Sequence, residues 1–145
     1  MNNSTFTVRE ATWAEDSAAL RAIRQRVFVE EQNVPPELEW DETDAQCLHA
    51  LAIDPTGNAI GCGRLLDGGK IGRMAVLPEW RDRGVGSALL RFLIDIAQSR
   101  GCTECRLDAQ IRAMGFYHRH GFTAEGEEFL DANIPHRHMR LTLPM

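Results

Sequence analysis

The spacing of apolar residues changes several times along the chain, and each change marks an expected element. Residues 5–10 alternate weakly in polarity, which predicts a strand. Residues 12–32 begin with Thr12 and Glu15 in the arrangement of a capping box, and apolar residues then recur every three to four positions. We therefore expect one or two helices there, followed by a loop over residues 33–46, which contain two prolines and many acids.

From residue 47 onward the pattern is typical of strands. Apolar runs cover residues 47–53, 59–66 and 71–77, and the segments between them contain the Asp, Pro and Gly residues that turns require. Pro78 ends the third run. These three segments predict an antiparallel meander.

An amphipathic helix is expected over residues 84–100. Its apolar stripe consists of Val85, Leu89, Leu93 and Ile96. Gly101 follows as a C-terminal stop, and residues 103–109 read as the next strand. A strand, a helix and a second strand in this order predict a parallel pair with a right-handed crossover.

The remaining residues predict a short helix over 110–120 and two closing strands over 121–130 and 136–143. Together the elements indicate an α+β fold with a mixed, mostly antiparallel, twisted sheet of about six or seven strands flanked by about four helices. A chain of 145 residues has the size of one domain, so we expect a single domain over residues 1–145.

Composition narrows the class of protein. Apolar residues make up 43% of the chain and charged residues 26%, and no window approaches the ~18 apolar residues of a membrane span. The N-terminus does not resemble a secretory signal, so we expect a soluble cytoplasmic protein without a membrane partner. The net charge of −5 and a single lysine, Lys70, argue against nucleic acid as a partner, because a polyanion usually needs a basic face.

Four cysteines occur, at Cys47, Cys62, Cys102 and Cys105. The last two have CxxC spacing, which leaves zinc or redox chemistry open. No second close pair accompanies them, so reduced thiols are the favoured interpretation and no metal is expected.

The stretch RDRGVGSALL, residues 81–90, places two glycines where the amphipathic helix begins. Backbone N–H groups at a helix N-terminus bind anions, and glycine lets a phosphate approach them. The alternative is a flexible helix start with solvated arginines. A nucleotide-binding loop is a weaker interpretation, because GxxxxGK[ST] is absent and Leu89 stands where GxGxxG requires its third glycine.

Two segments at a fixed separation resemble the GNAT acetyltransferase superfamily. These are RMAVLPEWRDRGVGSALL, residues 73–90, and LDAQIRAMGFYHRHGF, residues 107–122. The matching positions are Arg81, Gly84, Gly86, Ala113, Tyr117, Gly121 and Phe122. VFVEEQNVP and IPHRHMRL, residues 27–35 and 134–141, resemble the small ElaA-type branch of the superfamily.

The resemblance implies roles for individual residues. Met74, Ala75 and Val76 would match the splayed strand that binds the pantetheine arm of acetyl-CoA. The residues that would match the pyrophosphate loop are Arg81, Arg83, Gly84, Val85, Gly86 and Ser87. Tyr117 would match the acid that protonates the departing thiolate. Gln110 stands where many relatives have an asparagine that contacts pantetheine, so its amide is retained with a different reach.

The general base has two candidates. Seven acids within residues 30–44, with a second acidic group at Glu125, Glu127, Glu128 and Asp131, either attract a cationic amine and deprotonate it or form a solvated surface. His136 is the better single candidate, because an imidazole titrates near neutrality. His118 and His120 are interpreted as surface residues.

We therefore expect direct transfer of an acetyl group from acetyl-CoA to a primary amine of a small molecule or peptide. Acetyl-CoA is the expected cosubstrate, the acidic segments favour a cationic amine, and a homodimer is the default expectation. A CoA-binding sensor with little catalysis and a nucleotide-binding domain are the alternatives.

Overall fold

Seven strands form one mixed sheet in the computed structural model, which describes residues 5–144. The strand order is β1-β2-β3-β4-β5-β7-β6. The strands are β1 (Thr7–Ala11), β2 (Leu48–Ile53), β3 (Ala59–Leu66), β4 (Lys70–Val76), β5 (Glu104–Gln110), β6 (Thr123–Asp131) and β7 (Ile134–Thr142). All neighbours are antiparallel except β4 and β5, which confirms both the expected meander and the parallel crossover. Residues 1–4 and 145 of the expected domain lie outside the described residues.

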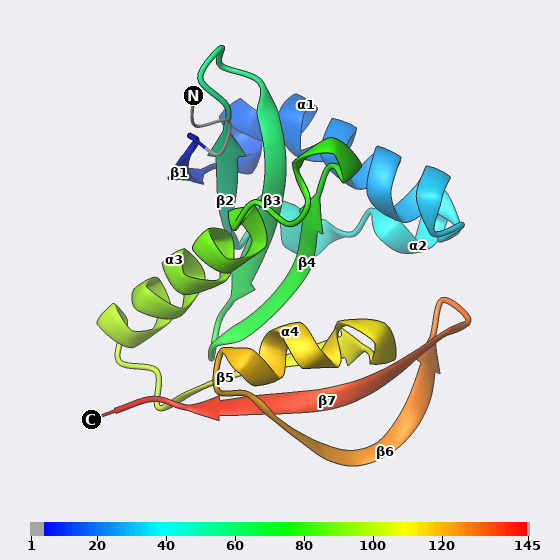
Figure 1. Ribbon diagram of the computed structural model, residues 1–145, viewed down its shortest axis with the longest axis vertical. Coiled ribbons are helices and arrows are strands. Elements are labelled where there is room, and N and C mark those ends of the chain that lie inside the picture. The colour runs from blue at the N-terminus through cyan, green and yellow to red at the C-terminus, as the bar shows by residue number, and fades with distance from the viewer. Residues whose placement is uncertain (1–4, 145) are drawn as a thin grey trace.

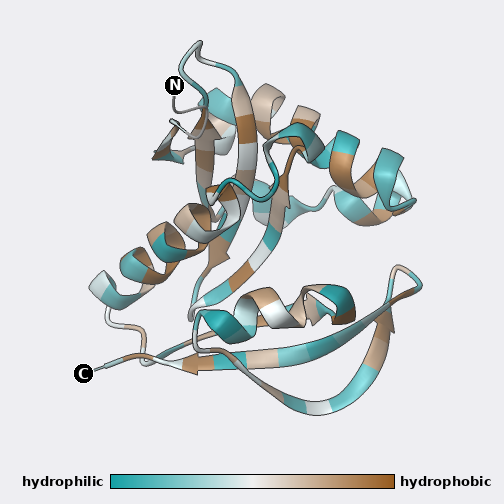
Figure 2. Ribbon diagram, viewed as in Figure 1, coloured by the Kyte–Doolittle hydropathy of each residue, from teal (hydrophilic) through white to brown (hydrophobic). Residues whose placement is uncertain are grey.

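Helical segments cover both faces of the sheet (Figure 1). They are α1 (Trp13–Arg24), the π-helical η1 (Gln25–Glu31), α2 (Pro36–Glu39), η2 (Glu42–Ala45), η3 (Pro78–Trp80), α3 (Val85–Ser99), η4 (Ile111–Ala113) and α4 (Met114–Arg119). Leu20 of α1 belongs to a core on one face, and Leu89 and Leu93 of α3 belong to a larger core on the other. Figure 2 shows both apolar and polar bands along α3, as expected of the amphipathic helix that the sequence predicts.

The start of α1 confirms the predicted cap and refines it. Thr12 Oγ1 accepts a hydrogen bond from the Glu15 backbone N–H, as in a capping box. The reciprocal acceptor for the Thr12 backbone N–H, however, is the Asp16 carboxylate. This hydrogen bond lies one residue beyond the position that the capping-box pattern indicates.

The segment expected to be a loop over residues 33–46 contains the two short helices α2 and η2. Pro36 occupies the first position of α2, where proline's missing N–H has no helical partner to lose. Glu39 and Asp44, in these helices, form buried ion pairs with Arg24 of α1. Tertiary contacts therefore order a segment whose local sequence predicts irregular structure.

β4 and β5 join at one end and then separate. Their ladder contains the single pair Lys70↔Arg106. Beside it, Gly69 has φ +89°, and a Cβ at this position would lie 2.2 Å from the Glu104 carbonyl oxygen. Only glycine allows so close an approach. The two strands are thus pinned at Gly69 and open toward Val76 and Gln110.

All four cysteines are free thiols in the structure. Burial raises the pKa of Cys62 to about 12 and that of Cys105 to about 11, so neither is an activated nucleophile. Within residues 5–144, none of the helices combines the length and hydrophobicity that a membrane span requires.

Candidate functional site

A cleft of about 890 Å³ lies along the opening between β4 and β5. Its walls come from η1, β4, the first turn of α3, the end of β5, α4 and the beginning of β7. Tyr117, His136 and all the residues expected to bind acetyl-CoA except Arg83 line this cleft. The volume is within the range of about 300–1,000 Å³ that is usual for ligand pockets.

The start of α3 forms one end of the cleft. Gly84 precedes the helix with φ +85°, a left-handed conformation that favours glycine. Gly86 and Ser87 follow within the first turn, whose backbone N–H groups have no partner inside the helix. A Cβ at Gly86 would make only ordinary contact with the Phe116 ring at 3.4 Å, so packing does not demand glycine there.

The two arginines of the loop have different surroundings. Arg83 lies over the Trp80 ring, with the guanidinium 5.1 Å from the ring centroid. Arg81 donates to both carboxylate oxygens of Glu31 at 2.6 and 2.7 Å, and its Nε donates to the Val76 carbonyl. The Arg81 guanidinium therefore links the end of η1 to the end of β4, and these hydrogen bonds use most of its N–H groups.

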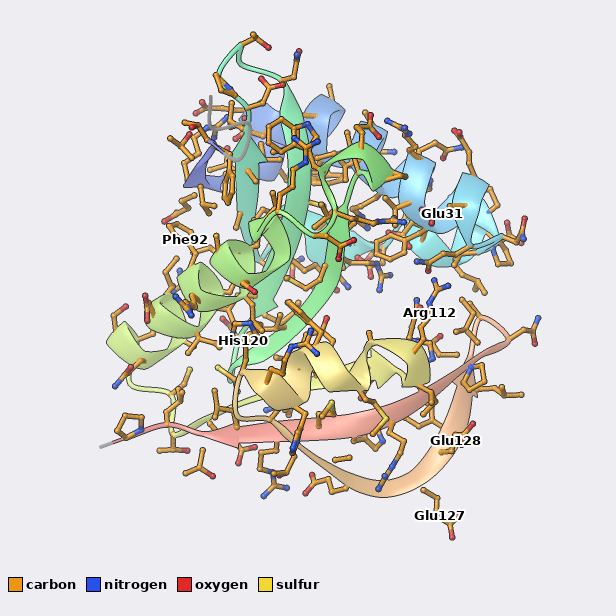
Figure 3. The ribbon with its side chains drawn as sticks, in the orientation of Figure 1. Glu31, Phe92, Arg112, His120, Glu127 and Glu128 are labelled. Atoms are coloured by element: carbon orange, nitrogen blue, oxygen red, sulfur yellow. The ribbon has the colours of Figure 1, made fainter. Side chains whose placement is uncertain are left out.

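Gln110 makes a second connection, to the residue that follows η1. Its Nε2 donates to Gln32 Oε1 at 2.7 Å, and its Oε1 accepts from Arg112 Nε at 3.0 Å. Both Glu31 and Arg112 line the cleft, and Figure 3 shows Arg112 near the beginning of α4 with Glu31 above it. The amide expected to contact pantetheine thus bridges the opening between β5 and the residue that follows η1.

Backbone groups of β4 line the opening as well. The Leu77 N–H donates to Ile60 O on the β3 side. Because backbone groups alternate in direction along a strand, those of Val76 face the side from which β5 has separated. The Val76 N–H is therefore available to a group lying in the cleft beside Met74 and Val76.

Tyr117 lies on α4 between two other aromatic rings. Phe116 and Phe122 meet it edge to face, at centroid distances of 5.0 and 6.0 Å. Burial raises the pKa of Tyr117 to about 12. The phenol therefore stays protonated throughout the physiological pH range.

His136 is buried at the β7 side of the cleft. Its Nδ1 lies 2.6 Å from the Ile134 carbonyl oxygen, and its ring stacks on Phe129. A carbonyl can only accept a hydrogen bond, so Nδ1 carries the proton when the ring is neutral. Nε2 then has a free lone pair, as a proton acceptor requires.

Arginines neutralise much of the acidic segment. Glu31 pairs with Arg81, and the buried Glu39 and Asp44, together with the exposed Asp41, form a network with Arg24, Arg64 and Arg73. Four of its seven acids are thus held by cations of the chain itself. Of the second acidic group, Glu125 pairs with Arg140, and Figure 3 shows Glu127 at the outer edge of β6. Asp131 alone of that group lines the cleft.

One residue that sequence reasoning placed at the surface belongs to the site region. His120 is half-buried, and its Nε2 lies 3.0 Å from the Ser87 hydroxyl. His118 is exposed, as expected. No sequence spacing signals the Ser87–His120 contact, because 33 residues separate the two partners and only the packing of α4 on α3 brings them together.

Asp44, Cys47 and His49 lie close enough together to suggest a metal site. The Asp44 carboxylate already accepts hydrogen bonds from Arg24 and Arg64. His49 Nε2 donates to the Asp44 backbone carbonyl at 2.8 Å. These partners use the ligand atoms that a cation would need, and the cluster is accounted for as a hydrogen-bonded part of the core.

Comparison with known proteins places the geometry in a family. Residues 10–143 match the family model described as an acetyltransferase (GNAT) domain. The chain is 41% identical to the uncharacterized N-acetyltransferase YjcF of Bacillus subtilis over 121 residues, which are 81% of this chain and 86% of that protein.

Solved structures agree with this match. An acyl-CoA N-acyltransferase from Pseudomonas aeruginosa is 29% identical, with a TM-score of 0.84 over 95% of this chain and 100% of that one. Escherichia coli ElaA is 25% identical, with a TM-score of 0.83 over 94% of this chain and 99% of that one. The chain therefore belongs to the GNAT family of acetyltransferases, in agreement with the ElaA-type resemblance of its sequence.

Proposed function

We propose that the protein transfers an acetyl group directly from acetyl-CoA to a primary amine of a small molecule or peptide. The observation that carries this proposal is the cleft itself, which joins the start of α3 to Val76, Tyr117 and His136. The GNAT match supports acyl transfer in general.

The residues present fit acetyl-CoA. Gly84, Gly86 and Ser87 offer backbone N–H groups and a hydroxyl to the pyrophosphate at the positive end of the α3 dipole. A Cβ at Gly84 would have no neighbour within 4 Å, so the space beside this loop is open. The backbone of Met74, Ala75 and Val76 lines the separated edge of β4, where the pantetheine arm is expected to lie.

Each chemical step of the proposed transfer can then be assigned to a residue. Acetyl-CoA supplies the acetyl group as a thioester. The Val76 N–H polarises the carbonyl oxygen as an oxyanion-hole donor does. Tyr117 donates its proton to the departing thiolate; burial raises its pKa to about 12, so it carries this proton at neutral pH. His136 accepts the proton of the attacking amine at Nε2.

The cleft as a whole offers little net negative charge. It is lined by five acids and six cationic residues, namely Glu31, Glu39, Asp82, Asp108 and Asp131 beside Arg64, Lys70, Arg73, Arg81, Arg112 and Arg119. Asp108 is itself in contact with Lys70 and His138. The proposed acceptor is therefore an amine bound by shape and hydrogen bonds, without a strong requirement for further positive charge.

Replacing Tyr117 by Phe tests the proposal. The ring and its aromatic contacts remain while the proton donor is lost, so we expect kcat to fall by about 10²–10⁴-fold with acetyl-CoA and a panel of amines. CoA affinity measured by calorimetry should stay within about twofold of the wild type, with folding confirmed by the thermal unfolding midpoint.

Three results would contradict the assignment in different ways. A wild type that binds CoA but acetylates no amine is a sensor. Displacement of CoA by ATP in competition indicates a nucleotide-binding domain. An unchanged rate in Tyr117→Phe removes the tyrosine from the mechanism and leaves CoA binding intact.

A further inference from the structure

α4 ends against the first turn of α3, at the pyrophosphate end of the cleft. Figure 3 shows His120 at this end of α4, next to α3. Its ring lies 5.1 Å from that of Phe116, and Nε2 is 3.0 Å from Ser87 Oγ. Ser87 lines the cleft, whereas His120 does not. His120 can therefore influence a bound ligand only through the serine and through its charge.

The direction of the Ser87–His120 hydrogen bond depends on where the imidazole carries its proton. If Nε2 has a lone pair, it accepts the serine proton, and the serine presents only oxygen lone pairs to the cleft. If Nε2 is protonated, it donates to Oγ, and the serine O–H is free to donate to a phosphate oxygen. An imidazolium has protons on both nitrogens and allows only the second arrangement.

The surroundings of His120 favour the neutral ring in the absence of ligand. Burial, Arg91 of α3 and Arg119 of α4 all lower its pKa from the usual 6.5. Phe116 and Ser87, which contact the ring, carry no charge. A phosphate bound at the start of α3 adds negative charge beside the imidazole and so favours its protonated form.

We propose that His120 is a positioning residue for the pyrophosphate of acyl-CoA, which turns the Ser87 hydroxyl toward the phosphate and couples binding of the cosubstrate to uptake of a proton. This inference rests on the proposed function of the loop at residues 81–87. By linkage, a group that gains a proton on binding makes the affinity rise as the pH falls through the interval between its free and bound pKa values. Above this interval the ring is neutral in both states, and the pH has no effect through His120.

The test measures binding of dephospho-CoA by calorimetry between pH 5.5 and 8 in buffers of different ionisation enthalpy. This ligand retains the pyrophosphate but lacks the 3′-phosphate, whose own titration near pH ~6 would obscure that of the protein. For the wild type we expect proton uptake and an affinity that rises as the pH falls, by at most about tenfold per pH unit.

Two variants locate the effect. In His120→Gln, both the pH dependence and the proton uptake should be lost, while dephospho-CoA still binds. Ser87→Ala keeps the imidazole but removes the hydroxyl that it orients toward the ligand. This variant should reduce the affinity for dephospho-CoA most at low pH. His118→Gln is the matched control, because this exposed histidine lies two residues away on the same helix and should retain the wild-type pH profile.

Retention of the wild-type pH profile and proton uptake in His120→Gln would overturn the inference while leaving the loop assignment intact. So would a wild type that binds dephospho-CoA with neither effect. A wild type that binds neither CoA nor dephospho-CoA overturns the proposed function and the inference together.

Discussion

Neighbouring groups fix the proton positions of individual side chains in the cleft. The Ile134 carbonyl holds the proton of His136 on Nδ1, and burial keeps Tyr117 protonated. One residue thus has a lone pair available and the other a proton, as the proposed direct transfer requires. The sequence indicates both residue types, but their protonation follows from contacts with Ile134 and with two phenylalanines.

At this scale we predict that His136→Gln loses at least about 100-fold in kcat, because a general base contributes about 10²–10⁴-fold. His138→Gln is the control, since His138 stacks on the same Phe129 but has a side chain that is 57% exposed. Steady-state rates and CoA affinity should separate them, with the control within a few fold of the wild type. Equal losses in both variants would assign the effect to Phe129 packing.

The element that defines the site is the pair β4 and β5. Its strands share the single pair Lys70↔Arg106 and then diverge, so the opening depends on how tightly the joined end is held. Gly69 provides this closeness through the approach of its Cα to the Glu104 carbonyl. Local sequence predicts both strands, yet nothing local specifies where they separate.

We predict that Gly69→Ala destabilises the fold by about 3 kcal/mol, combining a left-handed backbone with a steric clash. Gly57→Ala is the matched control, because Gly57 has a similar φ of +92° with nothing within 4 Å of its Cβ position. The Gly57→Ala substitution should lower the free energy of unfolding by about 1 kcal/mol. Urea unfolding measures both, and equal losses would show that β4 and β5 can move apart at no cost.

On the scale of the whole molecule, a buried charge network joins α1 and the short helices α2 and η2 to β3 and β4. Arg24 is its centre, donating to Glu39 and Asp44 at 2.7 Å. Burial alone would raise the pKa of Asp44, but Arg24 and Arg64 outweigh it and keep this pKa below its usual value. Arg73 of β4, whose backbone has a left-handed φ of +51°, pairs with Glu39 of this network. The acidic segment therefore also contacts the strand beside the cleft.

We expect Arg24→Met to cost about 3 kcal/mol in the free energy of unfolding, because it leaves buried carboxylates with one cation fewer. The control is Arg26→Met, two residues farther along the chain than Arg24, which removes an exposed ion pair with Glu79. It should cost under about 1 kcal/mol in the free energy of unfolding. Chemical unfolding at pH 7 compares them. A loss in Arg24→Met no larger than in the control would mean that the network adds no net stability.

The amino-acid sequence by itself determined the order of the seven strands and the longer helices, the parallel crossover and the glycine loop at the start of α3. These features depend on residue spacing and on backbone conformations that glycine permits, both of which are local. The two motifs also sufficed to indicate the GNAT family, because they hold specific residues at a fixed separation.

Only the tertiary structure decided which charges are available and which partners side chains have. Most of the acids in residues 30–44 are neutralised by distant arginines, Arg81 is held by Glu31, and His120 contacts Ser87 across 33 residues of chain. Such contacts join elements that are far apart in sequence. Their physical reason is the packing of helices onto the two faces of the sheet, which periodicity and composition do not encode.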